Sequence, residues 1–258
     1  MTVSLASFFW ITLASGLVLF PPAAGRADTL LLQPSADTGL LEVAPDNNLG
    51  GAIFFNAGTA NNGSRNRALL FFDLSELLPV GSLVTGVEVS LDVVRQPQSG
   101  QVNSIFSLRR GLLSWGEGAQ EPVDPQNPGL GSPALPGEAT WNASFAGSSL
   151  WPQPGGSFST TLSSSSFVSS VGEPVLFVST PSLIADLQFW IDHPESNFGW
   201  TLLSESEELV KTARSFASLE SGFGPTLTVQ YTPVPEPGGI ALLGLFLIGF
   251  AAVARWRR

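Results

Sequence analysis

The feature that most constrains the fold is a strict two-residue alternation of apolar and polar side chains over residues 87–93, Val-Glu-Val-Ser-Leu-Asp-Val. Successive side chains of a strand point to opposite faces, so this run puts all its apolar side chains on one face. A helix would distribute the same side chains around its circumference. The run therefore predicts a β-strand with one face in a core and the other in water.

Further strand-like runs are separated by Gly, Pro and Asn, which is typical of an antiparallel β-sandwich. One short helix interrupts them. Thr180 and Pro181 form an N-cap and first turn, apolar residues follow at helical spacing, and His193-Pro194 ends the run. We expect this helix to cover one end of the sandwich. The predicted strands are 29–32, 52–56, 68–73, 84–94, 105–108, 174–178, 199–203 and 226–231.

Residues 28–232 are enough for one all-β domain with a sizeable core. Within them, the segment 116–170 is rich in Pro, Gly and Ser and shows no clear period. We expect this segment to form surface loops with a few short strands, some of it mobile.

Residues 1–27 have the pattern of a signal peptide. An apolar run, 5–20, ends at Pro21-Pro22, and small residues lead to a cleavage point after Ala27. No Lys or Arg precedes the run, so a permanent N-terminal anchor is the alternative. The run is short for a bilayer span and ends at a helix breaker, which favours cleavage.

Residues 233–258 have three parts: the motif Pro235, Glu236 and Pro237, an uncharged run over 238–254, and a basic tip, Arg-Trp-Arg-Arg. As a helix the run is about 26 Å long, just enough to cross a bilayer. The arginines of the tip favour the cytoplasmic side, which places the large domain outside.

This tail resembles the PEP-CTERM sorting signal. The resemblance implies recognition of Pro235, Glu236 and Pro237 by an exosortase, a membrane-embedded cysteine protease of Gram-negative bacteria that make exopolysaccharide. It also implies a precursor that is anchored transiently in the inner membrane and then moves to the cell surface or the extracellular matrix. The alternative is an ordinary tail anchor that follows two prolines.

Charge excludes one class of partner. Of the 11 Lys and Arg residues four lie in the two ends, and of the 21 Asp and Glu residues one does, which leaves 7 basic against 20 acidic residues, a net charge of about −13. Nucleic acid binding requires basic groups that displace counterions, so we expect no nucleic acid partner. Cysteine is absent, which excludes thiol chemistry and Cys-based metal sites.

Separated motifs follow one another along the central region. They are Ala-Asp-Thr at 36–38, Pro-Asp-Asn-Asn-Leu-Gly at 45–50, Arg-Ala-Leu-Leu-Phe-Phe-Asp-Leu-Ser at 67–75, Trp-Gly-Glu at 115–117, Ala-Thr-Trp at 139–141, Asn-Phe-Gly-Trp at 197–200, Phe-Ala-Ser-Leu-Glu at 216–220 and Pro-Thr-Leu-Thr-Val-Gln-Tyr at 225–231. In this order they resemble a DNRLRE domain, a family similar to family 96 carbohydrate-binding modules. The resemblance implies a jelly-roll-like antiparallel β-sandwich that binds carbohydrate and has no catalysis of its own. Leu219 and Gly224 stand where the family has Arg, which weakens any ligand role of that loop.

Enzyme chemistry has little support in the sequence. His193 is the only histidine and stands at a helix end, where capping or simple exposure is expected. Glu205, Glu207 and Glu208 crowd one short loop, which indicates a solvated edge and not the paired carboxylates of a glycoside hydrolase.

Tryptophan is the residue type that suits sugar stacking, and it also fills cores. Trp115, Trp141, Trp190 and Trp200 fall on the motifs or on the helix, so we expect them in the core. Trp151 lies in the loop Leu-Trp-Pro-Gln-Pro-Gly-Gly, 150–156, and is the candidate for carbohydrate binding.

Oxygen-bearing side chains suggest a structural Ca²⁺ near the first strands. Asp37, Asp46, Asn47 and Asn48 are of the type that binds hard cations. The alternative is turn chemistry without a metal, because Pro-Asp-Asn-Asn forms a loop by itself.

Together these patterns predict an exported, non-enzymatic surface protein that binds extracellular polysaccharide. The alternatives are a purely structural matrix protein without a small ligand, and a polysaccharide-degrading enzyme.

Overall fold

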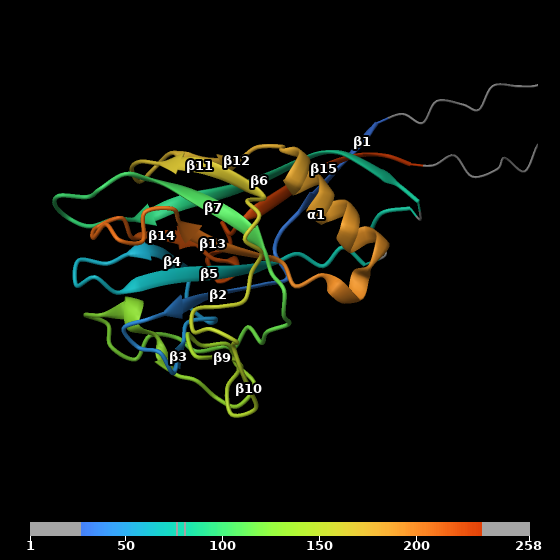
Figure 1. Cartoon of the computed structure of the whole chain (residues 1–258). Coiled ribbons are helices and arrows are strands. Elements are labelled where there is room, and N and C mark those ends of the chain that lie inside the picture. Colours follow the sequence, from blue (N-terminus) through green and yellow to red (C-terminus); the bar gives the residue numbers. More distant parts are fainter. Residues whose placement is uncertain (1–26, 76, 80, 234–258) are drawn as a thin grey trace, which may run out of the picture. The chain divides into compact units, whose positions relative to one another are not determined.

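The computed structural model describes residues 27–75, 77–79 and 81–233, which form a curled antiparallel β-sheet with one α-helix against it (Figure 1). The predicted signal peptide before Ala27 and the sorting motif lie outside the described residues. The helix is α1 (Pro181–Asp192), and three short 3₁₀ turns are η1 (Pro128–Leu130), η2 (Pro194–Ser196) and η3 (Leu219–Ser221). The strands are β1 (Asp28–Leu32), β2 (Ala36–Leu41), β3 (Asn47–Asn48), β4 (Phe54–Thr59), β5 (Arg65–Phe71), β6 (Leu83–Arg95), β7 (Ser104–Arg110), β8 (Ser132–Pro133), β9 (Ala143–Phe145), β10 (Ser149–Leu150), β11 (Ser164–Val168), β12 (Pro174–Phe177), β13 (Trp200–Ser204), β14 (Arg214–Ala217) and β15 (Thr226–Thr232).

The large sheet runs in the order β1-β15-β6-β14-β4-β5-β13-β7-β11, with β12 also paired to β6 and β2 to β5. Its longest strand, β6, lies between β15 and β12, because Val89 pairs with Leu227 and with Phe177. Strand β14 pairs with the C-terminal part of β6 and β15 with its N-terminal part, so both strands pair with β6. The segment 218–225 between them, which contains η3, is an excursion from the sheet.

The alternation in residues 87–93 has the predicted effect. Val87, Val89, Leu91 and Val93 are buried in the main core, and Asp92 faces solvent. The curl of the sheet brings the inner faces of β5, β7 and β13 onto this surface, and Phe55 and Phe216 stack within it, 5.8 Å between ring centroids. The β-rich, sandwich-like fold expected from the sequence is confirmed at this level.

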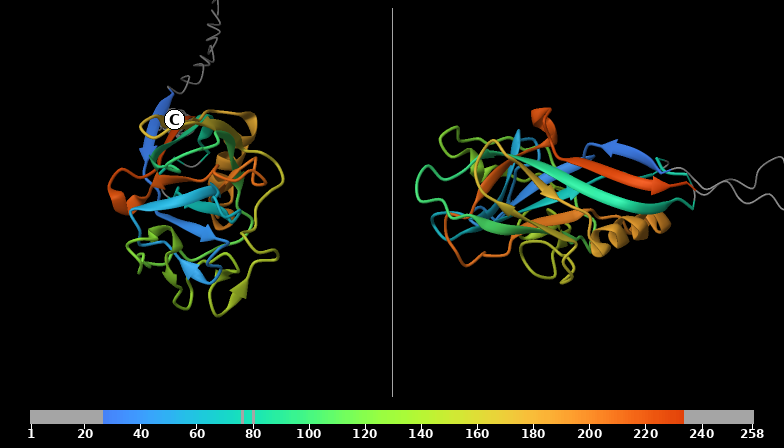
Figure 2. Two further views of the ribbon diagram at one scale, coloured as in Figure 1. Left: turned by 90° about the vertical axis from the view of Figure 1, so that its left-hand side faces the viewer. Right: turned by 90° about the horizontal axis from the view of Figure 1, so that it is seen from above.

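Helix α1 begins and ends where the sequence predicts. Thr180 is the N-cap, and its side-chain oxygen accepts a hydrogen bond from the backbone N–H of Leu183 (3.0 Å). Leu183, Leu187 and Trp190 on one face of the helix are buried in the main core. Figure 2 shows the helix lying beside the long strand β6. The helix therefore closes one part of the core, as expected.

A half-buried carboxylate fixes the helix to the sheet. Asp186 accepts hydrogen bonds from the hydroxyl of Ser163 and from the indole N–H of Trp200 (3.2 Å), and pairs with Arg110 (3.3 Å). Burial raises the pKa of Asp186, and the three partners lower it against that effect. The carboxylate joins α1 to β7, to β13 and to the start of β11.

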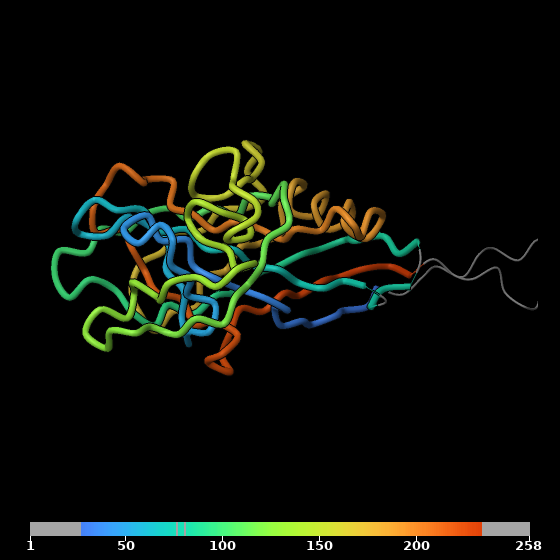
Figure 3. The backbone as a smooth tube through the Cα atoms, turned by 90° about the horizontal axis from the view of Figure 1, so that it is seen from below, coloured from blue at the N-terminus to red at the C-terminus, as the bar shows by residue number. Residues whose placement is uncertain are grey.

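The segment 116–170 is more ordered than the sequence suggests. It contains the predicted short strands, which form the pairs β3-β8 and β9-β10 and the β7-β11 pair. It also packs across strand β2, as Figure 3 shows from below. A second buried cluster forms there from Leu40, Leu69, Ala139, Trp141 and Trp151.

The first and last described strands are partners. Asp28 of β1 pairs with Tyr231 of β15, and the register continues to Leu32 and Leu227. The start of β1 and the end of β15 therefore lie side by side (Figure 1). In the described part of the chain no helix is both long and apolar enough to cross a bilayer. The predicted span, 238–254, lies outside that part.

Candidate functional site

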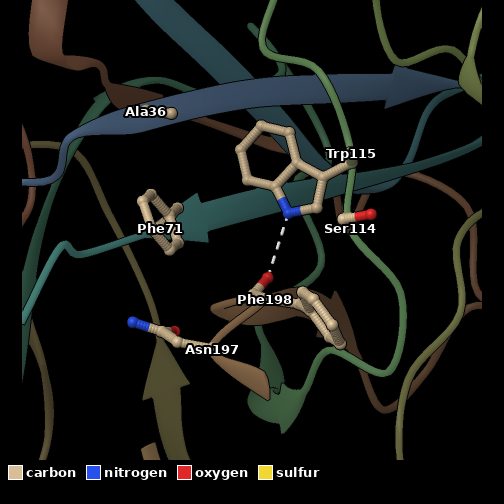
Figure 4. Close-up of a pocket in the computed structure, with 6 residues that line it drawn as sticks. All are labelled: Ala36, Phe71, Ser114, Trp115, Asn197 and Phe198. Carbon is tan, nitrogen blue, oxygen red and sulfur yellow. Dashed lines mark hydrogen bonds between the residues drawn. The ribbon is translucent and has the colours of Figure 1, made fainter. Parts of the chain in front are cut away.

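Three half-buried aromatic side chains meet in a surface hollow of about 200 Å³. Phe71 comes from the end of β5, Trp115 from the chain after β7, and Phe198 from the chain before β13 (Figure 4). Ala36, Ser114 and Asn197 complete the lining. We call these six residues the aromatic hollow.

Hydrogen bonds hold the aromatic hollow in shape. The indole N–H of Trp115 donates to the backbone carbonyl of Phe198 (3.0 Å), as the dashed line in Figure 4 shows. The Asn197 side chain donates to the carbonyl of Phe72 (2.8 Å) and accepts from the N–H of Gly199 (3.1 Å). With its N–H satisfied inside the protein, the Trp115 ring can present apolar area to a ligand without leaving a polar group unpaired.

A glycine permits the close approach of these segments. Gly199 has φ +71, and a Cβ there would lie 1.9 Å from the carbonyl oxygen of Leu70. No other residue fits this position, because a side chain would force the segment before β13 away from β5. The glycine thus places Phe198 and Phe71 on one surface.

A second, larger depression adjoins the hollow. It has a volume of about 570 Å³ and shares Phe71 and Asn197 with the hollow. Its size is within the usual range for small-molecule sites. We call it the helix groove. The remaining lining residues are Asp73, Leu74, Ser75, Leu78, Gly81, Trp190, Ile191, Asp192 and Pro194.

The charges of the helix groove are negative. The Asp73 carboxylate accepts the N–H of Ser75 (2.9 Å), and the bonds to Ser75 hold the pKa of Asp73 below its usual range. Asp192, exposed in the last turn of α1, accepts a bond from Gln188 (3.2 Å). The carbonyl end of a helix adds further negative potential.

The arginine side chains of the described domain are engaged elsewhere. Arg214 is buried, and Arg95 lies over the Phe54 ring, 4.4 Å from its centroid. No Lys or Arg lines the aromatic hollow or the helix groove. Four arginines form ion pairs: Arg65 with Glu42, Arg67 with Glu207, Arg109 with Glu205 and Arg110 with Asp186.

The expectation that Trp151 is exposed for stacking is wrong. The side chain is 5% exposed and belongs to the second buried cluster. Its indole N–H donates to the carbonyl of Thr140 (2.8 Å). The Pro- and Gly-rich loop folds back onto β2 and β5, and this packing could not be read from the loop's composition.

The expectation for the other tryptophans is partly wrong. Trp141, Trp190 and Trp200 are buried as expected, whereas Trp115 lines the aromatic hollow. Trp115 is half-buried and packs against the edge of the second buried cluster, whereas Trp151 lies within that cluster. The neighbouring Phe71 and Phe198 give the one local signal that could have identified the hollow, since both stand at strand boundaries in the quoted motifs.

The four predicted calcium ligands have separate partners within the protein. Asp46 accepts a bond from the Asn142 side chain (2.9 Å), and Asn47 donates to the carbonyl of Leu130 (2.8 Å). Asn48 is fully engaged: its amide nitrogen donates to the carbonyls of Glu117 (2.7 Å) and Ala139 (2.8 Å), and its oxygen accepts the N–H of Gly50 (2.8 Å). No group of three or more His, Asp and Glu side chains within 27–75, 77–79 and 81–233 is arranged to hold a metal ion.

Asp37, the fourth predicted ligand, is buried among acidic groups. It is 1% exposed, and its carboxylate accepts the N–H of Leu219 (2.8 Å). Burial, opposed by that bond and assisted by Glu220 and Glu117, raises the pKa of Asp37 to about 8. Glu117 also accepts the backbone N–H of Asp37 (2.8 Å), and burial raises its pKa.

The residues with possible acid–base chemistry contact other side chains of the protein. His193 is exposed, is the C-cap of α1, and stacks on Phe189 with ring centroids 4.7 Å apart. Glu205 and Glu208 are exposed, as the solvated-edge interpretation expects, and Glu205 pairs with Arg109. Glu207 differs, because it is half-buried in an ion pair with Arg67.

No protein-family model matches the sequence, and no curated protein matches it.

Proposed function

We propose that the chain is an exported, non-enzymatic surface protein whose central domain binds extracellular polysaccharide at the aromatic hollow and the helix groove. The observation that carries the proposal is the meeting of Phe71, Trp115 and Phe198 in a surface hollow that adjoins the groove. Aromatic faces supply apolar area for the C–H faces of sugar rings, and the hollow's amide and hydroxyl groups can bond to ring hydroxyls.

The proposal also covers the family of the domain, its export and its sorting. The domain is a jelly-roll-like, DNRLRE-type module of residues 28–232, and residues 233–258 are a PEP-CTERM signal that an exosortase reads at Pro235, Glu236 and Pro237. A signal peptide, 1–27, directs export, and the tail holds the precursor in the inner membrane of a Gram-negative bacterium before transfer to the surface or matrix.

The test is glycan binding by the full-length protein in detergent micelles. We expect Phe198→Ala and Trp115→Ala to weaken binding of the best glycan from a panel by about tenfold, because each removes a stacking face worth on the order of 1 kcal/mol or more. Phe223→Ala is the matched control, since Phe223 is 78% exposed on the 218–225 excursion and lines neither depression.

Two results would favour the alternatives. Absence of binding to every glycan of the panel by the folded protein would favour a purely structural matrix protein. Release of new reducing ends or unsaturated products from a bound glycan would indicate a polysaccharide-degrading enzyme, and His193→Ala would then test whether the single histidine takes part.

A structural Ca²⁺ remains a separate proposal, centred on Asp37. A ligand that binds only the folded state raises stability, so about 1 mM Ca²⁺ over a site with Kd of about 10 µM should add roughly 2.7 kcal/mol. Melting curves in Ca²⁺ and in EDTA test this for the wild type and for Asp37→Asn. Identical curves for the wild type would leave turn chemistry as the role of Asp46, Asn47 and Asn48.

A further inference from the structure

We infer that the helix groove selects glycans by charge, binding chains with free amino groups in preference to neutral chains and rejecting uronate chains. This inference rests on the proposed function and names its substrate class. The carboxylates of Asp73 and Asp192 are the selecting groups.

The first argument is the negative charge of the helix groove. Asp73 is held ionised by its bonds to Ser75, and Asp192 stands in the last turn of α1, where the helix carbonyls add negative potential. The two carboxylates line the same groove. A protonated amine in the groove would meet attraction from both, whereas a uronate would meet repulsion.

The second argument is the lack of a basic partner for an acidic sugar. Recognition of carboxylates normally uses Arg or Lys, with Arg preferred for its paired donors. No such residue lines the hollow or the groove, and four of the domain's arginines are already paired with Asp or Glu. His193 stacks on Phe189 and does not line the groove.

The third argument is the apolar remainder of the lining. Leu74, Leu78 and Ile191 supply C–H surface in the groove that the two carboxylates also line. Such a surface suits the face of a pyranose ring, and the carboxylates suit substituents on its edge. A glucosamine-type chain presents both.

The test compares three oligosaccharides of equal length on the full-length protein at pH 6: glucosamine, N-acetylglucosamine and galacturonate oligomers. We expect the affinity to fall in that order. Binding of the glucosamine oligomer should also weaken as the salt concentration rises from about 0.05 to about 0.5 M. In Asp73→Asn/Asp192→Asn the glucosamine preference should fall by about fivefold for each carboxylate. Asn at position 73 can still accept the Ser75 N–H, so folding should be preserved.

A second charge-matched variant separates local from global charge. Asp92→Asn/Glu173→Gln removes the same net charge from exposed positions outside the groove, and we expect it to leave the preference unchanged. An equal loss in both double variants would overturn the assignment to Asp73 and Asp192. Galacturonate binding as tight as glucosamine binding, in EDTA, would overturn the selectivity. Binding of none of the three by the folded protein would contradict the proposed function itself.

Discussion

At the scale of single residues, this domain keeps several charged groups away from water for structural reasons. Arg214 is 1% exposed and pairs with no carboxylate of the described residues. Its guanidinium donates instead to backbone carbonyls, among them Ser169 (2.9 Å) and Ala213 (3.0 Å), and to the Asn103 side chain (2.9 Å). Asp37 is the acidic counterpart, a carboxyl with acidic neighbours. Asp37 belongs to the Ala-Asp-Thr motif at 36–38, whereas Arg214 lies in none of the quoted motifs. Neither residue lines the candidate site.

We expect Arg214→Ala to lower the free energy of unfolding by about 3 kcal/mol or more, because several buried carbonyls lose their donor. Arg214→Lys should recover only part of the loss, since an ammonium cannot reach the same set of carbonyls. Urea unfolding measures both, and Arg95→Ala serves as the control. A loss below about 1 kcal/mol for Arg214→Ala would show that water replaces the guanidinium.

Asp37 predicts a pH dependence of stability. Its pKa is about 8 in the folded protein and about 3.9 in an unfolded chain. The folded state therefore holds the proton more tightly, and its contribution to stability is complete below pH 4 and declines as pH rises toward 8. In EDTA, Asp37→Asn should remove this decline and raise the melting temperature by several degrees at pH 8 to 9.

The matching control is the same pH series on Glu88→Gln, a half-buried carboxylate on β6. Parallel melting curves for the wild type and Asp37→Asn between pH 5 and pH 9 would contradict the raised pKa of Asp37.

At the scale of elements, hydrogen bonds at both ends of α1 fix the position of the helix on the curled sheet. Its N-cap Thr180 bonds both to Leu183 N–H and to the carbonyl of Ser163 at the start of β11, and Asp186 returns to the Ser163 hydroxyl. At the other end, Gln188 accepts the backbone N–H of Val84 (2.9 Å). The C-terminal turn of α1, with Trp190 and Asp192, is thereby positioned as one wall of the helix groove.

Thr180→Ala should therefore lower stability by about 1 kcal/mol through loss of the N-cap, and somewhat more through loss of the Ser163 bond. For a domain of this size the melting temperature should fall by about 2–4 °C for each kcal/mol. Thr161→Ala, at an exposed threonine, is the control. Equal melting temperatures for the two variants would mean that the cap contributes nothing.

The sequence predicted the elements whose patterns are local. Strand β6 and helix α1 were placed correctly, because alternation and capping are readable over a few residues. Strands β2 and β14 were not predicted, and β11 was expected only as one of the unplaced short strands of 116–170. They carry polar residues that the fold buries, such as Asp37, Ser164 and Arg214, so hydropathy did not indicate them. Their stability comes from partners distant in sequence.

The same limit applies to the candidate site. The aromatic hollow joins chain segments around residues 71, 115 and 198, which no sequence period connects. The loop around Trp151 has the composition of an exposed loop but is held down by a bond to Thr140 and by packing on Leu40 and Leu69. Burial of that kind depends on the whole fold and not on the loop's residues.

At the scale of the whole molecule, the proposed sorting tail makes a prediction about processing. In cells that carry an exosortase, we expect the mature surface protein to lack residues 255–258. Mass spectrometry of the protein released from the surface measures the C-terminus directly, and Glu236→Ala should retain the tail. Intact Arg258 on mature wild-type protein from such cells would contradict the PEP-CTERM assignment.

The pairing of β1 with β15 has a mechanical consequence. Because Asp28 and Tyr231 are partners, a force that pulls the start of β1 away from the end of β15 would separate the two strands one residue pair at a time. A force applied through the C-terminal end alone would instead run along β15, whose register with β6 extends from Thr226 to Thr232. The bonds of that register would then bear the load together, in shear. If the chain is cleaved before β1, as proposed, only this second path is left, and a domain tethered at its C-terminal end would bear drag forces in shear.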